Sequence, residues 1–158
     1  MSGYEASKRK SRISFPKTRF KCRECGKCCM EDNKGGRKIV LTERDAEEIS
    51  NATGIKLTDF SKGNDSEAYP NVMKLIDGKC FFLGPGNKCS IYRARPLVCR
   101  FYPFVMQKIG ERYVFHVDPS CPGLGEGMYL DREYFEKLVE EAEERLNRFA
   151  KRLRVPYT

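Results

Sequence analysis

The sequence predicts a small single domain of the α+β class that is stabilised by bound metal, with short β-hairpins and one long C-terminal helix. Three observations carry this prediction: eight cysteines among 158 residues, two hairpin turn signals, and one long amphipathic pattern near the C-terminal end. The length suits a single domain. Charged residues make up 33% of the chain, so the apolar core must be small for this length. We therefore expect the cysteines to add stability as cross-links or metal ligands.

Residues 1–19 are expected to form a basic flexible arm, and residues 20–158 a cysteine-cluster metal-binding domain that includes the C-terminal helix. The first 21 residues carry seven basic side chains and one acidic one, which accounts for most of the net charge of +8. Such an arm attracts nucleic acid or an acidic protein through non-specific electrostatics, and it equally fits a solvated terminus that only adds solubility.

The first half of the domain shows few regular patterns before residue 38. Thr42 followed by Asp45 forms a capping-box-like start for a short helix over residues 45–51, with Gly54 close to its end. The other expectations are a cysteine-bearing loop over 20–36, a short strand over 38–41, a helical turn over 57–60 and a loop over 61–71.

Two hairpins are expected in the second half. Asp77-Gly78 is a strong two-residue turn signal between strands 72–76 and 79–83, and Gly110-Glu111 separates strands 104–109 and 112–117. Pro96 should end a helical turn that begins near Arg93, because the residue before a proline avoids helical geometry. Residues 118–128, rich in proline and glycine, should form a loop.

The C-terminal helix is expected over residues 131–154. Asp131 caps it, and Pro156 stops it. Steps of three and four separate the apolar residues of a continuous stripe that should pack on the core: Phe135, Val139, Ala142, Leu146, Phe149 and Leu153.

Eight cysteines in two groups indicate metal binding. The first group has a C-x2-C-x2-C-C spacing, and the second is spread over 42 residues. A C-x2-C step lets two thiolates reach one ion through a tight turn, as in zinc and iron–sulfur sites. The residues are Cys22, Cys25, Cys28, Cys29, Cys80, Cys89, Cys99 and Cys121.

The adjacent pair Cys28-Cys29 favours an iron–sulfur cluster slightly over zinc. Neighbouring side chains diverge, so binding by both to one tetrahedral ion is strained. Different metals, different irons of one cluster, or a structural or redox role for one of the two thiols would suit the pair. Two four-cysteine zinc sites and a mixed arrangement stay open. Glu24 and Asp32 are close enough in sequence to join a site, whereas His116 is expected to be an ordinary strand side chain.

The chain has no apolar run long enough to span a bilayer and no apolar stretch typical of a signal peptide near residue 1. We therefore expect a cytoplasmic protein that does not bind membranes. In a reducing cytosol, metal ligation by cysteines is favoured over disulfides. Apolar packing alone would not place four cysteines among Lys21, Arg23 and Lys27, whereas these cations lower thiol pKa values.

Several spaced motifs resemble the YkgJ-type CxxCxxCC cysteine-cluster family. These are Phe20-x-Cys22-x2-Cys25-Gly26-x-Cys28-Cys29, then Cys80-Phe81-Phe82-Leu83, then Cys89-x-Ile91-Tyr92-x2-Arg95-Pro96-x2-Cys99-Arg100-x-Tyr102-Pro103-Phe104. The resemblance runs to Cys121 and covers about two thirds of the chain. It implies that all eight cysteines form the metal-binding set, as in domains described as chelating zinc or iron. It leaves the activity of these proteins open.

Arg95 and Arg100 are expected to stand beside the metal centre. Guanidinium groups donate hydrogen bonds to thiolate sulfur and offset the negative charge of a thiolate-rich site. An aromatic set should keep water from the site: Tyr92, Phe101, Tyr102, Pro103 and Phe104.

The sequence thus predicts a cysteine-ligated iron–sulfur or zinc protein, with electron transfer to a protein partner as one role. It identifies no catalytic acid or base. The alternative is a zinc-stabilised binding module whose basic arm contacts nucleic acid or an acidic partner. A third alternative is metal trafficking by exchange of ions between thiols.

Overall fold

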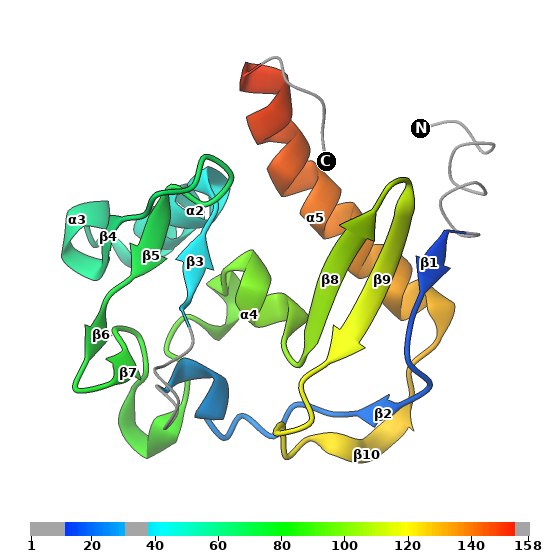
Figure 1. Cartoon of the computed structure of the whole chain (residues 1–158). Helices are drawn as coiled ribbons and strands as arrows, with labels where there is room; N and C mark the ends of the chain where they lie inside the picture. Colours follow the sequence, from blue (N-terminus) through cyan, green and yellow to red (C-terminus); the bar gives the residue numbers. More distant parts are fainter. Residues whose placement is uncertain (1–11, 31–37, 154–158) are drawn as a thin grey trace.

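The computed structural model describes residues 12–30 and 38–153, with the side chains of the last helix described as far as residue 146. Figure 1 shows two groups of elements. The first lies around β8 (Phe104–Ile109), β9 (Arg112–Val117) and α5 (Arg132–Leu153), the second lies around β3 (Val40–Leu41) and β5 (Asn71–Met73), and α4 (Leu97–Phe101) lies between them. The fold is the α+β class that the sequence predicts, with short strands and a long C-terminal helix.

The first group is a three-stranded sheet, in the order β1-β9-β8, covered by α5. β8 (Phe104–Ile109) and β9 (Arg112–Val117) form the predicted antiparallel hairpin, in register along their whole length. β1 (Ile13–Ser14) joins β9 in parallel. α5 (Arg132–Leu153) begins where predicted, because the Asp131 carboxylate accepts a 3.0 Å hydrogen bond from the Tyr134 N–H.

A two-stranded ribbon runs along the lower edge of the molecule in Figure 1. β2 (Arg19–Phe20) pairs antiparallel with β10 (Leu124–Tyr129), where the sequence predicts only a loop. The irregular register and the left-handed backbone of Gly125 and Gly127 explain why no alternating strand pattern marks β10.

The second group is a small sheet in the order β3-β5-β4, with α2 and α3 beside it. Thr42 and Asp45 form the predicted capping box at the start of α2, and Gly54 ends the helix in the left-handed conformation. The bounds are β3 (Val40–Leu41), α2 (Glu43–Thr53), α3 (Leu57–Phe60), β4 (Ser61–Gly63) and β5 (Asn71–Met73).

Short elements connect the two groups and carry most of the cysteines. Asp77 and Gly78 have positive φ in the predicted tight turn between β6 and β7, and a short helix after Pro96 was not predicted. The bounds are η1 (Lys27–Cys29), β6 (Leu75–Ile76), β7 (Lys79–Cys80), η2 (Pro85–Asn87), η3 (Tyr92–Ala94) and α4 (Leu97–Phe101).

Two hydrophobic cores match the two groups. The aromatic core contains no cysteine, and its buried residues are Ile13, Leu97, Phe101, Phe104, Tyr113, Phe115, Phe135, Leu138, Val139 and Ala142. The cysteine core consists of Cys29, Ile39, Leu41, Ile49, Phe60, Met73, Cys80, Phe82, Ile91 and Cys99. Cys28 and Cys89 pack against its side.

One buried ion pair joins the two groups. Asp45 of α2 accepts a 2.6 Å hydrogen bond from Arg145 of α5, and both side chains are almost completely buried. The same carboxylate accepts hydrogen bonds from the N–H groups of Thr42 and Leu97. Burial raises the pKa of Asp45, and these donors oppose that rise.

The predicted arm is only partly described. Residues 1–11 lie outside the described residues. Phe149 and Leu153 of the predicted apolar stripe lie where the side chains of α5 are not described. Residues 12–19 are part of the domain rather than a free arm, since Ile13 is 3% exposed and the Phe15 ring stacks on Phe135 at 4.6 Å. Apolar residues placed between the basic ones therefore attach this segment to the aromatic core.

Within the described part of the chain, no helix is both long enough and apolar enough to cross a membrane.

Candidate metal centre

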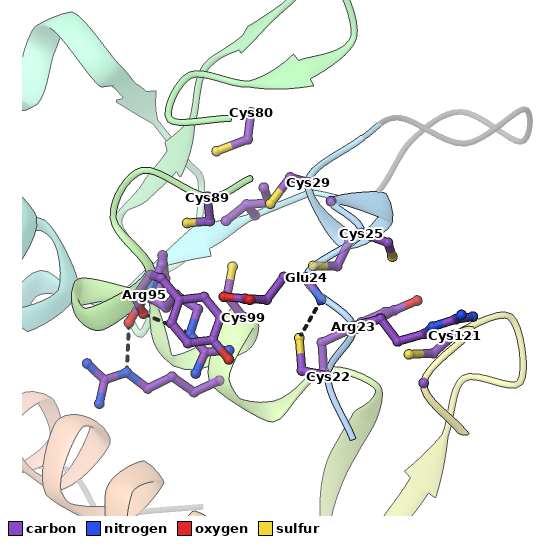
Figure 2. A pocket seen from close by; sticks show the side chains of 18 of the residues that line it. Cys22, Arg23, Glu24, Cys25, Cys29, Cys80, Cys89, Arg95, Cys99 and Cys121 are labelled. Atoms are coloured by element: carbon purple, nitrogen blue, oxygen red, sulfur yellow. Dashed lines mark hydrogen bonds between the residues drawn. The ribbon is translucent and has the colours of Figure 1, made fainter. Parts of the chain in front are cut away.

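All eight cysteines line one cavity of about 200 Å³ between the two groups of elements. Figure 2 shows thiols entering it from several segments that are far apart in the sequence. All eight are free thiols in the structure, so no disulfide competes for them. The cavity brings together residues almost 100 positions apart, as a shared metal centre requires.

A close backbone contact holds the cysteine-rich loop against the turn that precedes Cys89. Gly26 has a φ of 77°, and a Cβ there would collide with the carbonyl oxygen of Asn87. Only glycine permits both this conformation and this approach. The loop then forms η1, which buries Cys29, while Cys22 and Cys25 are exposed.

Isolated β-bridges place Cys29, Cys80 and Cys89 side by side. Met30, next to Cys29, pairs with Lys79, next to Cys80. A second bridge joins Leu83 to Cys89 and closes the turn between Cys80 and Cys89.

The β2–β10 ribbon places Cys22 near Cys121. The Lys21 N–H donates a 3.1 Å hydrogen bond to the carbonyl oxygen of Gly123. A Cβ at Gly123 would collide with the carbonyl oxygen of Lys21, so the two loops touch backbone to backbone. Cys99 enters the cavity separately, from α4, and is 8% exposed.

Cys29 is surrounded by three other thiols. Its thiol interacts with those of Cys28, Cys80 and Cys89, which lie in or against the same core, and we call these four the inner cysteines. The Cys28 thiol contributes most to a raised pKa of Cys29, and the thiols of Cys80 and Cys89 raise it further. As the donor, Cys29 lowers the pKa of Cys80 and brings that of Cys89 to about 7. The proton held by Cys29 can thus stabilise the thiolate form of both Cys80 and Cys89. The thiolate is the form of cysteine that binds metal.

Backbone amides already point at four of the sulfurs. The N–H of Glu24 donates to Cys22 Sγ at 3.4 Å, and the N–H of Phe82 donates to Cys80 Sγ at 3.5 Å. The amide of Ile91 donates to Cys89, and that of Gly123 to Cys121. Each donor lies two residues after its cysteine. Such bonds favour the charged thiolate and fix its direction before a metal arrives.

Arg95 and Arg100 both line the cavity, but they are held differently. The Arg95 guanidinium stacks on the Tyr92 ring at 3.9 Å, and its charge contributes to the lowered pKa of Cys89. Arg100 donates to the carbonyl oxygen of Arg95 at 2.8 Å and pairs with Glu141 at 2.9 Å. Arg95 is therefore the arginine that acts on a thiol electrostatically, and Arg100 braces the turn that carries it.

The prediction that an aromatic set keeps water from the site is correct in part. Tyr92 and Tyr102 line the cavity, whereas Phe101 and Phe104 belong to the aromatic core behind it. Other lining residues were not predicted, because they come from distant segments or lack a motif: Phe20, Ile39, Met73, Ile91, Pro96, Pro122 and Tyr134.

Of the other candidate ligands that the structure describes, Glu24 lines the cavity and His116 does not, and Figure 2 shows the Glu24 carboxylate among the sulfurs. His116 is exposed on β9 and lies 3.0 Å from the Gln107 side-chain oxygen. This is the ordinary strand position expected for it. Asp32 lies outside the described residues.

The donor set fits a thiophilic metal. Among the described residues, no group of three or more thiol, carboxylate or imidazole side chains already has the arrangement of a metal-ion site. The convergence of eight thiols and the amide donors nevertheless suit zinc, iron or an iron–sulfur cluster.

Residues 21–122 match the profile of the CxxCxxCC family, which is described as a "Putative zinc- or iron-chelating domain". The chain belongs to this family. The match includes all eight cysteines and supports a cysteine-based metal-binding role.

An uncharacterized protein of Methanocaldococcus jannaschii is 31% identical over 125 residues, which is 73% of this chain and 64% of that relative. This chain therefore spans less than two thirds of the relative's length. No solved structure matches the chain significantly.

Proposed function

We propose that this protein binds an iron–sulfur cluster through cysteine thiolates and uses it in electron transfer. The single observation that carries the proposal is the position of the adjacent pair: Cys28 and Cys29 both belong to the inner cysteines, with Cys80 and Cys89. Two consecutive side chains are strained on one tetrahedral ion but suit different irons of one cluster.

The surroundings of the inner cysteines support a cluster. Cys29 and Cys80 are each 7% exposed, and Phe82 packs beside them in the cysteine core. A dry apolar shell and amide N–H groups aimed at sulfur are what protein folds use to tune a cluster's reduction potential. When bound, the cluster would supply one-electron chemistry, while the chain fixes the thiolates and limits water access.

The positive charge near the cavity favours an acidic redox partner. Lys21 and Arg23 flank Cys22, and Lys27 lies one residue before Cys28; all three are exposed. Attraction between this basic surface and an acidic protein would speed their encounter. We place the protein in a reducing compartment such as the cytosol, where its thiols stay available to metal.

The zinc-stabilised binding module is the competing proposal. Part of the basic segment is already engaged, since Arg12 pairs with Glu111 at 3.0 Å and Arg19 donates to the Gly127 carbonyl oxygen at 2.6 Å. We therefore favour the redox role. Binding to RNA or DNA that is lost on deletion of residues 1–11, and that weakens steeply with salt, would instead support the module.

Anaerobic purification followed by iron, zinc and acid-labile sulfide analysis tests the proposal. We expect iron and sulfide together with visible sulfur-to-iron absorption that bleaches on reduction. The matched variants are Cys80→Ser, which should lose this absorption, and Thr58→Ala, which changes an exposed residue outside the cavity and should keep it. A colourless protein that carries zinc and no sulfide would refute the cluster.

A further inference from the structure

We infer that Arg95 and Tyr134 form a binding site for the carboxylate of a small organic acid, inside the cavity that gathers the eight thiols. Both side chains line this cavity. The inference goes beyond the proposed function, because it holds whether the thiolates bind a cluster or zinc. It would make the cavity a place where a small molecule meets the metal centre.

Arg95 differs from the other arginines of the cavity in lacking a carboxylate partner. Three arginines line the cavity. Arg100 pairs with Glu141 at 2.9 Å, and Arg23 pairs with Glu126 at 3.5 Å. Among the residues that the structure describes, Arg95 has no ion pair, and its Nη1 and Nη2 atoms donate no hydrogen bond. An arginine in this state can bind an anion that enters the cavity.

The Arg95 guanidinium is already held in place. Its Nε–H donates a 2.9 Å hydrogen bond to the carbonyl oxygen of Tyr92, and its central carbon lies 3.9 Å from the centroid of the Tyr92 ring. Its charge acts on the Cys89 thiol, yet it forms no hydrogen bond with that sulfur. The two Nη atoms therefore remain as a planar pair of donors, which matches the two oxygens of a carboxylate.

Tyr134 supplies a second donor from the other side of the cavity. Its ring is fixed by the aromatic core, with centroids 5.2 Å from Phe135 and 6.2 Å from Phe104. Its hydroxyl has no hydrogen-bond partner within the described part of the chain. Burial raises the pKa of Tyr134, and the nearby Arg95 charge opposes that rise. The hydroxyl is therefore protonated at neutral pH and can donate to an oxygen that Arg95 also holds.

The charges around the cavity favour a ligand with one negative charge. Arg95 supplies one positive charge, whereas the Glu24 carboxylate and the eight thiols line the same space. A phosphate with two negative charges would be repelled by thiolates and Glu24 more strongly than one guanidinium could offset. A carboxylate matches Arg95 in both charge and shape.

The size of the cavity limits the rest of the ligand. Its volume of about 200 Å³ is smaller than the roughly 300–1,000 Å³ of sites for drug-sized molecules. Figure 2 shows Arg95 and Cys121 on opposite sides of the cavity, with sulfurs between them. A carboxylate at Arg95 would thus direct a short apolar remainder toward the sulfurs, along the rings of Phe20 and Tyr92. We expect an acid of a few carbon atoms.

Saturation-transfer NMR with propionate tests the inference on the full-length, metal-loaded protein, purified anaerobically. Propionamide has the same size without the charge and is the matched control ligand, at constant ionic strength. We expect propionamide to bind more weakly than propionate by about tenfold or more. Arg95→Gln should weaken propionate binding by about tenfold or more, and Tyr134→Phe by about threefold to tenfold.

Two further variants separate a site from general attraction to a basic surface. Arg93→Gln removes the same charge from an exposed neighbour that does not line the cavity, and it should leave propionate binding unchanged. Arg95→Lys keeps the charge near Cys89, so it should retain its metal even if Arg95→Gln loads less. It should still weaken propionate binding, because an ammonium group lacks the planar fork. Metal content is measured for every variant.

The failures of the two proposals are distinguishable. A cluster-bearing protein that binds propionate no better than propionamide overturns the carboxylate site and leaves the cluster standing. Equal losses of propionate binding in Arg95→Gln and Arg93→Gln, or full binding in both Arg95→Lys and Tyr134→Phe, also overturn the site. A zinc protein without sulfide that binds propionate through Arg95 refutes the cluster and supports the carboxylate site.

Discussion

The two cores of this protein are held together by different physics. The aromatic core packs aromatic rings against one another. The ring of Phe135, which is completely buried, has its centroid 5.1 Å from that of Phe104 and 4.9 Å from that of Phe115. The cysteine core contains three buried thiols among its apolar side chains, and two further thiols pack against it. Apolar burial can stabilise the first core without help. The second gathers thiols whose charged form needs a metal, so metal should contribute much of its stability.

This contrast explains the division of labour along the chain. The sheet β1-β9-β8 and α5 form a scaffold, and the short elements from η1 to α4 form the site. In such a domain, one part of the chain supplies the stability of the fold and another part supplies the thiolates of the site. The predictions below test the contrast, from the largest expected effect to the smallest.

Removing the metal should affect the two cores very unequally. Because metal-binding free energy becomes folding free energy when a site forms only on folding, we expect the cysteine core to lose several kcal/mol, about enough to unfold it. Calorimetry after anaerobic chelation should show the transition of the loaded protein replaced by a smaller one, from the aromatic core alone. Restoring the metal should restore the original transition, and an unchanged thermogram would contradict the contrast.

Truncating one phenylalanine in each core compares their coupling to metal. Phe135→Ala and Phe60→Ala both empty a fully buried site and should each cost about 3–5 kcal/mol in the free energy of unfolding. Only Phe60→Ala should also weaken metal binding, because the Phe60 ring packs at 5.3 Å on Phe82, two residues after Cys80. Denaturant titration and metal content together check this. Equal metal loss in both variants would count against separate cores.

Breaking the ion pair between the groups should uncouple them. Asp45→Asn removes the fully buried carboxylate that pairs with Arg145 and leaves the guanidinium only Glu48, whose side chain is part-exposed, so we expect a cost of about 3 kcal/mol. The matched control is Glu144→Gln, whose carboxylate pairs with Arg44 at a largely exposed position and should matter by less than about 1 kcal/mol. Chemical denaturation measures both, and similar losses would refute a linking role for Asp45.

Two glycines with the same backbone conformation test the local design of the site. Gly26→Ala and Gly54→Ala both place a side chain at positive φ, which costs about 1–2 kcal/mol. Only the first also pushes the cysteine-rich loop away from Asn87, so only it should lower metal content. Metal analysis of the two purified variants decides, and full metal content in Gly26→Ala would show that the contact is dispensable.

Much of the fold was predictable because local signals are strong. The capping box at Thr42, the turn at Asp77-Gly78, the β8–β9 hairpin and the α5 stripe as far as Leu146 are confirmed. β1, β2, β4, β10 and α4 were missed, because most of them are short and the strands depend on distant partners. β10 in particular pairs irregularly with β2, and its sequence lacks the alternation of apolar and polar residues that predicts a strand.

The site was predictable in composition and not in arrangement. Spacing and resemblance pointed to all eight cysteines, and the structure brings them to one cavity. Which cysteines lie next to one another depends on the Met30–Lys79 bridge and the Lys21–Gly123 contact, which are long-range backbone contacts without a sequence motif. The different roles of Arg95 and Arg100 depend likewise on Glu141, 41 residues from Arg100.

Hydrogen–deuterium exchange of the metal-loaded and the metal-stripped protein tests the central claim most directly. The claim predicts that stripping abolishes protection at β3, β5 and β7, whereas the amides of β8, β9 and the start of α5 stay protected. Equal loss of protection in both groups of elements, or no loss in either, would contradict it.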